Sequence, residues 1–259
     1  MNYGLYLSAG GVLTNSHRQD VLANNLANVN TVGFKPDLAS AMARKPESAE
    51  ATSPLSTSQQ LLDRLGGGVL AGRTRTAFTP GPLQQTGRDL DTALTDHNSF
   101  FAVSVVDSAT GQNSIRLTRD GRFNTDATGQ LVAMSGHPVL GPDDLPIQLA
   151  PGVPVQITGQ GRVMQEGSVV GQIQVATVND LPSLEKAGSN LFAFTGADPR
   201  TPNLQPSIQT GAIEGSATNA IATMMQIMRT TKAATGNANL IKYHDSMMEQ
   251  AINTLGRVA

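Results

Sequence analysis

The two ends of this chain carry helical patterns, and a long stretch of different texture separates them. Apolar side chains recur at intervals of three and four in residues 4–29, which predicts an N-terminal helix. Residues 214–256 show heptad-like intervals that predict a second, longer helix. Both patterns are interrupted by polar residues, so neither helix should be stable alone. We therefore expect a mixed α and β fold in which two discontinuous terminal helices pair as a coiled coil.

The central stretch, residues 89–205, has the short apolar runs and turn signals of β-structure. Strands are expected at 100–106, 115–118, 122–124, 130–133, 153–157, 162–165 and 171–178. Asp120-Gly121 and Asp126–Gly129 have the residue types of hairpin turns, and a longer turn is expected at 107–113. Short strands at this spacing predict a compact, mostly-β domain that is sandwich-like or barrel-like.

Residues 35–88 show neither the helical nor the strand period of apolar residues. Prolines, a Ser/Thr-rich run and the triple glycine Gly66-Gly67-Gly68 break them, so we expect an extended connector with one short helix at 58–65. The predicted segments are then 1–34 as the N-terminal helix, 35–88 as the connector, 89–205 as the β-domain and 206–259 as the C-terminal helix.

Charge and cysteine content narrow the possible partners. The formal net charge is −2 and 15% of residues are charged, which gives no long-range field for nucleic acid. The absence of Cys excludes disulfides and thiolate metal sites. No apolar run approaches the roughly 18 residues of a membrane span, so no direct membrane insertion is expected. The opening residues also lack the basic region of a cleavable secretory signal.

The sequence has few motifs typical of catalysis or ligand binding, and we expect no catalytic, cofactor-binding or metal site. His17, His97, His137 and His244 are scattered without metal-ligand spacing. The run Gly66–Ala71 loosely fits a dinucleotide fingerprint but does not follow a strand. The acidic turns at 120–129 lack the spacing of a calcium loop.

An amide-rich run near the end of the first helix is unusual for a helix core. Asparagines cost helix propensity, and their side chains seek backbone partners. Gly33 is placed to supply a positive φ, and Phe34 to turn the chain back. We interpret the run as an assembly motif that makes cap or lattice hydrogen bonds, the alternative being a frayed helix end. Its residues are Asn24, Asn25, Leu26, Ala27, Asn28, Thr31, Gly33 and Phe34.

Three ordered blocks of sequence resemble the bacterial flagellar basal-body rod family, the axial proteins of the FlgF and FlgG type. The first block is 22–35. The second runs over 79–103, 117–123 and 136–140, and the third from 211–216 to 247–255. The chain departs from the family pattern at Asp96–Ser99, where members usually place glycines.

The resemblance implies a structural subunit of the rod, without enzymatic activity, that polymerises helically through its terminal helices. In such proteins the helices form an inner coiled-coil layer and the β-domain lies outside it. The implied partners are other copies, other rod and hook proteins, and the type III export apparatus, which exports such subunits without a cleavable signal peptide. The proximal-rod, FlgF-like type is favoured.

Apolar positions at three- and four-residue intervals are candidates for the buried helix seam. They are Leu5, Ala9, Val12, Leu22, Ile221, Met224, Met228, Ile241, Met248, Ile252 and Leu255, with Leu26 beside them. Low aromatic content, 4%, also fits a chain that reserves apolar surface for other subunits. Three alternatives stay open: a distal-rod or hook subunit, a β-domain enzyme such as a hydrolase, and a non-polymerising binding or adhesin module.

Overall fold

The computed structural model describes residues 3–44, 67–106, 111–194, 198, 200–203 and 205–255. The short helix expected at 58–65 lies outside these residues, as do residues 107–110 of the expected turn. The chain divides into two compact units. A helical unit takes its described residues from 1–27, 37–75 and 220–259, and a β-rich unit from 28–36 and 76–219.

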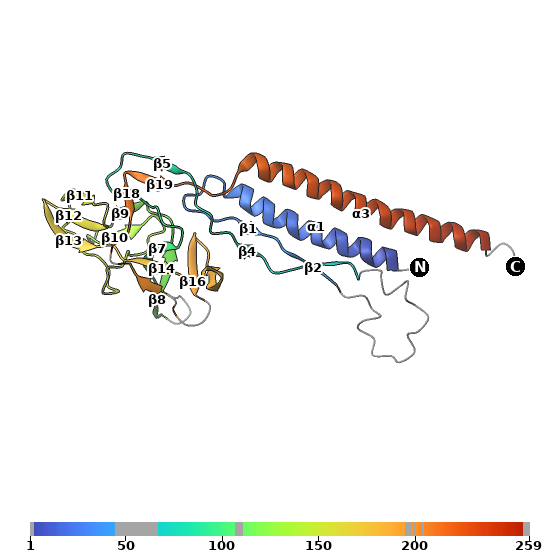
Figure 1. The fold of residues 1–259 in the computed structure, drawn as a ribbon, viewed down its shortest axis with the longest axis horizontal. Coiled ribbons are helices and arrows are strands. Elements are labelled where there is room, and N and C mark those ends of the chain that lie inside the picture. Colours follow the sequence, from blue (N-terminus) through green and yellow to red (C-terminus); the bar gives the residue numbers. More distant parts are fainter. Residues whose placement is uncertain are drawn as a thin grey trace. The chain divides into compact units, whose positions relative to one another are not determined.

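The helical unit is built on two long helices, α1 (Tyr3–Ala27) and α3 (Ala220–Leu255), which pack side by side (Figure 1). They run antiparallel, because Gly4 lies against His244 while Gly11 lies against Asn237. A helix at each end of the chain is confirmed. The predicted bounds need correction, since α1 ends at Ala27 rather than 29 and α3 begins at Ala220 rather than 214.

The described part of the connector forms short strands rather than featureless chain. These are β1 (Asp37–Leu38), β2 (Ala41–Ala43), β3 (Val69–Ala71), β4 (Arg75–Thr76) and β5 (Leu83–Gln85). In the helical unit β2 and β3 pair antiparallel, with Met42 opposite Leu70, and β3 packs on α1. The Thr14 hydroxyl donates to the Val69 carbonyl at 3.3 Å, so this two-stranded ribbon is fastened to the helix.

A six-stranded antiparallel sheet dominates the β-rich unit, in the order β15-β16-β8-β7-β14-β17. Its strands are β7 (Ser99–Val106), β8 (Asn113–Thr118), β14 (Val175–Val178), β15 (Leu184–Lys186), β16 (Leu191–Phe194) and β17 (Arg200–Pro202). The one-turn helix η1 (Leu181–Ser183) precedes β15. At the β17 edge Pro202 has no N–H, and the Arg200 N–H donates to Asp198 Oδ1 at 3.0 Å. The β15 edge carries Glu185 and Lys186.

Smaller ladders complete the β-rich unit. A three-stranded sheet joins β11 (Val155–Ile157), β12 (Arg162–Gln165) and β13 (Ser168–Gln172). Three two-stranded ladders pair β9 (Phe123–Thr125) with β10 (Leu131–Ala133), β5 (Leu83–Gln85) with β19 (Ala212–Glu214), and β6 (Thr92–Leu94) with β18 (Ile208–Thr210). The central β-rich character is therefore confirmed.

Two local predictions are corrected. The strand expected at 171–178 is broken between β13 and β14, because the Ile173 N–H donates to Gly161 and the Gln174 N–H to Leu140. Asp120-Gly121 is not a hairpin turn, because the strands on either side of it, β8 and β9, pair with other strands, and the Thr92 N–H donates to the Gly121 carbonyl. The Asp126–Gly129 turn does connect paired strands, with the Gly129 N–H donating to Asp126 at 2.9 Å.

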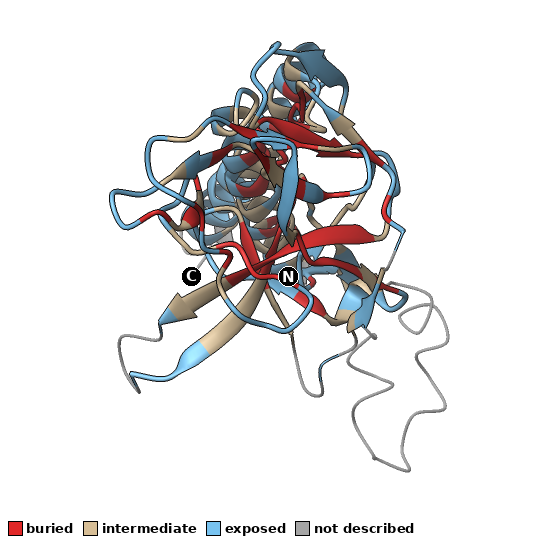
Figure 2. Ribbon diagram, turned by 90° about the vertical axis from the view of Figure 1, so that its left-hand side faces the viewer, coloured by how far each residue is buried: buried red, intermediate tan, exposed pale blue. Residues whose placement is uncertain are grey.

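Strand β7 carries the core of the β-rich unit on both of its faces. Successive side chains of a strand point to opposite sides, so Phe101 and Val103 join one buried cluster while Phe100 and Ala102 join another. Phe101 meets Phe123 edge-on, with ring centroids 5.1 Å apart. Figure 2 shows buried residues along the strands of this unit. Burial on both faces explains why this segment is a continuous apolar run rather than an alternating one.

Candidate functional site

Large apolar side chains are exposed along α3. We call the following set the α3 stripe: Ile221, Met224, Met225, Met228, Leu240, Tyr243, Met247, Met248 and Ile252. They are between 37% and 74% exposed. No member lies between Met228 and Leu240, so the stripe consists of two groups of exposed apolar side chains. Large exposed apolar patches on a soluble protein usually mark a contact with another macromolecule.

The face of α3 that meets α1 is instead polar and small. Thr223 and Thr230 are buried there, and Asn237 and His244 continue the row at steps of seven residues. Of the predicted seam positions on α3, Ile241 alone is half-buried among the described side chains, while Ile221, Met224, Met228, Met248 and Ile252 are exposed. The side chain of Leu255 lies outside the described residues.

Helix α1 leaves one narrow face open. Ser8 is buried, and the predicted seam residues Leu5, Ala9, Val12 and Leu22 are half-buried or buried. Tyr6 and Leu13, seven residues apart, are 69% and 70% exposed. The exposed pair therefore lies on one side of the helix, apart from the faces that α3 and the ribbon occupy.

The asparagine motif makes its described bonds inside the chain. Asn25 is buried; its Nδ2 donates to the Asp37 carbonyl at 2.7 Å, and its Oδ1 accepts from the Asp37 N–H at 2.8 Å. The amide side chain thus pairs with the backbone of β1 as a neighbouring strand would. Asn28 accepts a hydrogen bond from the Thr31 hydroxyl at 3.1 Å, in the turn that follows α1. The remaining motif positions before the turn, Asn24, Leu26 and Ala27, are exposed or half-buried.

The turn after the motif has the predicted geometry. Gly33 has φ +69°, and its N–H donates to the Glu214 carbonyl at 2.6 Å. A Cβ there would stand 2.7 Å from the Arg119 carbonyl carbon, so conformation and space both require glycine. Phe34 is buried, and its carbonyl accepts from the Ala217 N–H at 3.1 Å. The segments that lead into and out of the β-rich unit therefore lie side by side within it.

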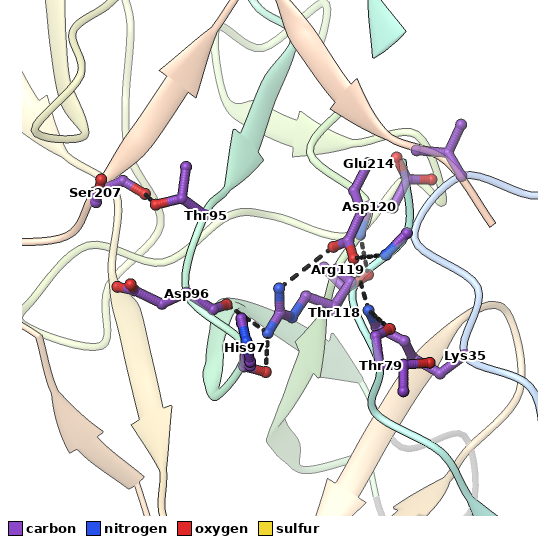
Figure 3. Close-up of polar contacts among 12 residues, drawn as sticks. Lys35, Thr79, Thr95, Asp96, His97, Thr118, Arg119, Asp120, Ser207 and Glu214 are labelled. Atoms are coloured by element: carbon purple, nitrogen blue, oxygen red, sulfur yellow. Dashed lines mark hydrogen bonds and ion pairs between the residues drawn. The ribbon is translucent and has the colours of Figure 1, made fainter. Parts of the chain in front are cut away.

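A buried ionic junction fastens these two segments together (Figure 3). Lys35 Nζ donates to Glu214 Oε1 at 2.6 Å and to the Thr79 carbonyl at 2.7 Å. Arg119 Nη1 donates to Glu214 Oε2 at 3.3 Å, and the Gly81 N–H donates to Oε1 at 2.8 Å. The three charged side chains are 1–2% exposed. We call Lys35, Arg119 and Glu214 the junction triad.

The junction triad holds two cations and one anion, so backbone dipoles supply the rest of its stabilisation. Arg119 Nη2 donates to the Asp96 carbonyl at 2.8 Å and to the His97 carbonyl, and its guanidinium lies 4.7 Å from the centre of the Phe100 ring. Burial lowers the pKa of Lys35 from its ordinary value, and attraction to Glu214 opposes that shift. Burial lowers the pKa of Arg119 in the same way.

These three residues lie in the sequence blocks 22–35, 117–123 and 211–216, but no local pattern connects them. Lys35 and Glu214 are 179 positions apart, and no periodicity links positions so distant. The available signal was chemical and weak: Glu214 is a lone charge inside a block of small and apolar residues, whereas Arg119 has Asp120 and Arg122 beside it. A charged group in an apolar block is either exposed or paired, and Glu214 is paired.

The described residues offer little for small-molecule chemistry. They contain no group of three His, Asp or Glu side chains that could hold a metal ion. An open cleft of about 510 Å³ is lined by Thr95–Ser99, Thr177 and Asn203, and so includes the Asp96–Ser99 departure from the family pattern. In the helices that the structure describes, no stretch is long and apolar enough to cross a membrane.

Comparison with known proteins gives consistent matches. A family model described as flagella basal body rod protein matches residues 5–35, and one described as flagellar hook protein FlgE/F/G D1 domain matches residues 96–171. The rod protein FlgF of Caulobacter vibrioides is 29% identical over 259 residues, covering all of both chains. FlgF of Escherichia coli is 30% identical over 246 residues, 90% of each chain. FlgG of Buchnera aphidicola from Acyrthosiphon pisum is 29% identical, covering 95% of this chain and 97% of the relative.

The paired terminal helices, the β-rich unit and the full-length matches define a structural protein of the bacterial flagellum. The first family model covers α1 and the turn after it, and the second covers β7 to β13 of the β-rich unit. The chain belongs to the family of flagellar basal-body rod proteins, and its role is that of a structural subunit of the rod.

Proposed function

We propose that copies of this chain polymerise helically through their terminal helices, with the α3 stripe and the Tyr6–Leu13 pair as the surfaces that neighbours cover. The exposure of the α3 stripe is the observation that carries this proposal. Burying an apolar side chain of this size contributes roughly 1.5–3 kcal/mol when the burial is complete. Several such contacts per copy offset the entropy of ordering two long helices.

The chemistry of the stripe fits a lattice of identical subunits. Five of its nine members are methionines, whose unbranched thioether chains adapt to neighbours of differing shape. Identical chains on a helical lattice meet one another in slightly different geometries, and adaptable side chains tolerate this. In the same assembly α1 and α3 would form the inner, coiled-coil layer, with Leu22 and Ile241 in its seam.

The proposal keeps four assembly segments: 1–34, which contains α1; the connector 35–88; the β-domain 89–205; and 206–259, in which α3 follows the short strands β18 and β19. The β-domain would lie outside the helical layer as a sandwich-like or barrel-like body. The asparagine motif would support assembly indirectly, because Asn25 holds β1 in place beside the helix.

The proposed partners are other copies, neighbouring rod and hook proteins, and the flagellar type III export apparatus, with export that needs no cleavable signal peptide. We assign the chain to the FlgF-like, proximal part of the rod, because two FlgF relatives match it over essentially their whole length. FlgG relatives match at similar identity, so a distal position is the competing assignment. The chain would act mechanically and not as an enzyme.

The test replaces stripe residues with aspartate and measures swimming and rod incorporation in a strain that lacks the gene. Met228→Asp and Ile252→Asp should abolish both, because a carboxylate cannot be buried unpaired against apolar neighbours. The matched controls are Gln226→Asp and Gln250→Asp, which place the same charge at exposed polar positions two residues away. These controls should keep swimming and incorporation near the wild-type level.

The test also separates folding from assembly. Thermal unfolding of the purified variants should leave the β-rich unit unchanged, since the substituted positions lie in the helical unit. Wild-type swimming by both stripe variants would refute polymerisation through this surface. Swimming by a chain without residues 1–30 would favour a non-polymerising binding module instead.

A further inference from the structure

Helix α1 contains three glycines within its first nine residues, which is costly for a helix. Each glycine in a helix interior is destabilising by roughly 1 kcal/mol relative to alanine. The structure supplies a reason at each position, because a neighbouring atom occupies the space that a side chain would need. Gly10 lies under the Val69 carbonyl of the ribbon, and Gly4 and Gly11 lie under side chains of α3.

The two contacts with α3 form matching pairs of knob and notch. A Cβ on Gly4 would stand 2.8 Å from Nε2 of His244, and one on Gly11 would stand 3.0 Å from Cγ of Asn237. Both distances are shorter than a normal van der Waals contact. The imidazole and the amide therefore fill notches that exist because these two positions lack side chains.

The spacing makes the two pairs act together. Gly4 and Gly11 are seven residues apart, as are Asn237 and His244, so the pairs are one heptad apart along an antiparallel seam. If α3 slipped by seven residues in one direction, His244 would lie beyond the start of α1. If it slipped in the other direction, Asn237 would meet Arg18 instead of a glycine. Either slip therefore leaves one of the two side chains, His244 or Asn237, without a glycine opposite it.

A fourth helical glycine provides the contrast. Gly236 lies in the middle of α3, and no atom lies within 4 Å of the position that its Cβ would take. Space does not require glycine there. The helical glycines described in this unit thus differ: Gly236 has open space beside it, whereas at Gly4 and Gly11 a side chain of α3 occupies that space.

We propose that Gly4 and Gly11 are a register key that fixes the alignment of α1 against α3, with His244 and Asn237 as its two teeth. On α3 the seam carries the buried threonines Thr223 and Thr230 where a coiled coil would usually place large apolar side chains. The key selects one alignment and thereby fixes which side chains the α3 stripe presents beside Tyr6 and Leu13. The proposal rests on the proposed function only for what those surfaces bind.

The first experiment tests alignment in the full-length chain. The chain has no natural cysteine, so introduced pairs are unique. Gly4→Cys with His244→Cys, and Gly11→Cys with Asn237→Cys, should be cross-linked efficiently as disulfides on mild oxidation, since a disulfide needs Cα atoms within about 7 Å of each other. The crossed pairs, Gly4→Cys with Asn237→Cys and Gly11→Cys with His244→Cys, use the same four sites. They should give at most a tenth of that yield, because a heptad separates them by about 10 Å along the axis.

The second experiment fills one notch and reads the other. In the Gly4→Cys, His244→Cys chain, adding Gly11→Ala should lower the cross-link yield several-fold. Adding Asn237→Ala to that chain should restore it, because removing the tooth makes room for the new methyl group. Gly236→Ala is the matched control and should leave the yield unchanged.

Several results would overturn the register key. One is equal yield from matched and crossed pairs, and another is an unchanged yield after Gly11→Ala. A third is the absence of any matched cross-link in both the purified chain and isolated basal bodies. These results are independent of swimming by the stripe variants, so the register key and polymerisation through the stripe can fail separately.

Discussion

Replacement of Glu214 by glutamine is the sharpest test of the junction triad. The substitution keeps the shape of the side chain but removes the negative charge that Lys35 and Arg119 share, each of these cations being about 1% exposed. Removing one partner of a buried ion pair costs about 3–5 kcal/mol, because the remaining charge is left uncompensated. In a chain of this size a loss of that magnitude corresponds to a Tm decrease of roughly 6–20 °C.

Differential scanning calorimetry of the full-length chain would measure the change. Amide hydrogen exchange in β19 and β5 would assign the affected transition to the β-rich unit, since Glu214 lies in β19. Glu185→Gln is the matched control, because it makes the same chemical change on an exposed edge strand. The control should stay within about 0.5 kcal/mol of wild type. If the free energy of unfolding of Glu214→Gln also stayed within about 1 kcal/mol of wild type, the charge of Glu214 would not stabilise the fold, and the argument from buried charge would be wrong.

Two further predictions concern Lys35 and Asn25. Burial lowers the pKa of Lys35 in the folded chain, so between that pKa and the unfolded value of 10.5 the unfolded chain binds the additional proton. The free energy of unfolding should therefore rise with pH just below 10.5 in wild type, and denaturant titrations of Lys35→Met should lack this rise; equal slopes would contradict it. Asn25→Ala leaves the Asp37 N–H and carbonyl without their partner, which costs about 1–3 kcal/mol and should speed exchange of the Asp37 amide by roughly 5- to 150-fold. An exposed asparagine in the turn after α1 provides the control, and Asn30→Ala should leave that exchange rate unchanged.

The features predictable from the sequence are those with a local cause. Helical periodicity over tens of residues located α1 and α3, and alternating or continuous apolar runs located β7, β8 and β12. The positive φ of Gly33 followed from its place after a helix. These signals lie within one turn or one strand of the residue concerned.

The features that sequence reasoning missed depend on distant partners. Strands β18 and β19 are three residues each, and their partners β6 and β5 lie more than 100 positions earlier. Three residues are too few to establish a period, so the segment 211–216 was assigned to the C-terminal helix instead. The triad was missed for the same reason, since Glu214 becomes a site only when β19 brings it to Lys35.

The edges of the six-stranded sheet have a consequence for a protein that works in close-packed copies. A sheet edge with free N–H and carbonyl groups can recruit a strand from the next copy, and the product is an aggregate instead of an ordered shaft. In β17, Pro202 has no hydrogen to offer and Asp198 already holds that of Arg200. In β15, Glu185 and Lys186 would place charges against an incoming strand. Neighbouring copies are therefore hindered from pairing sheet edge to sheet edge, and this aggregation does not compete with assembly through the helices.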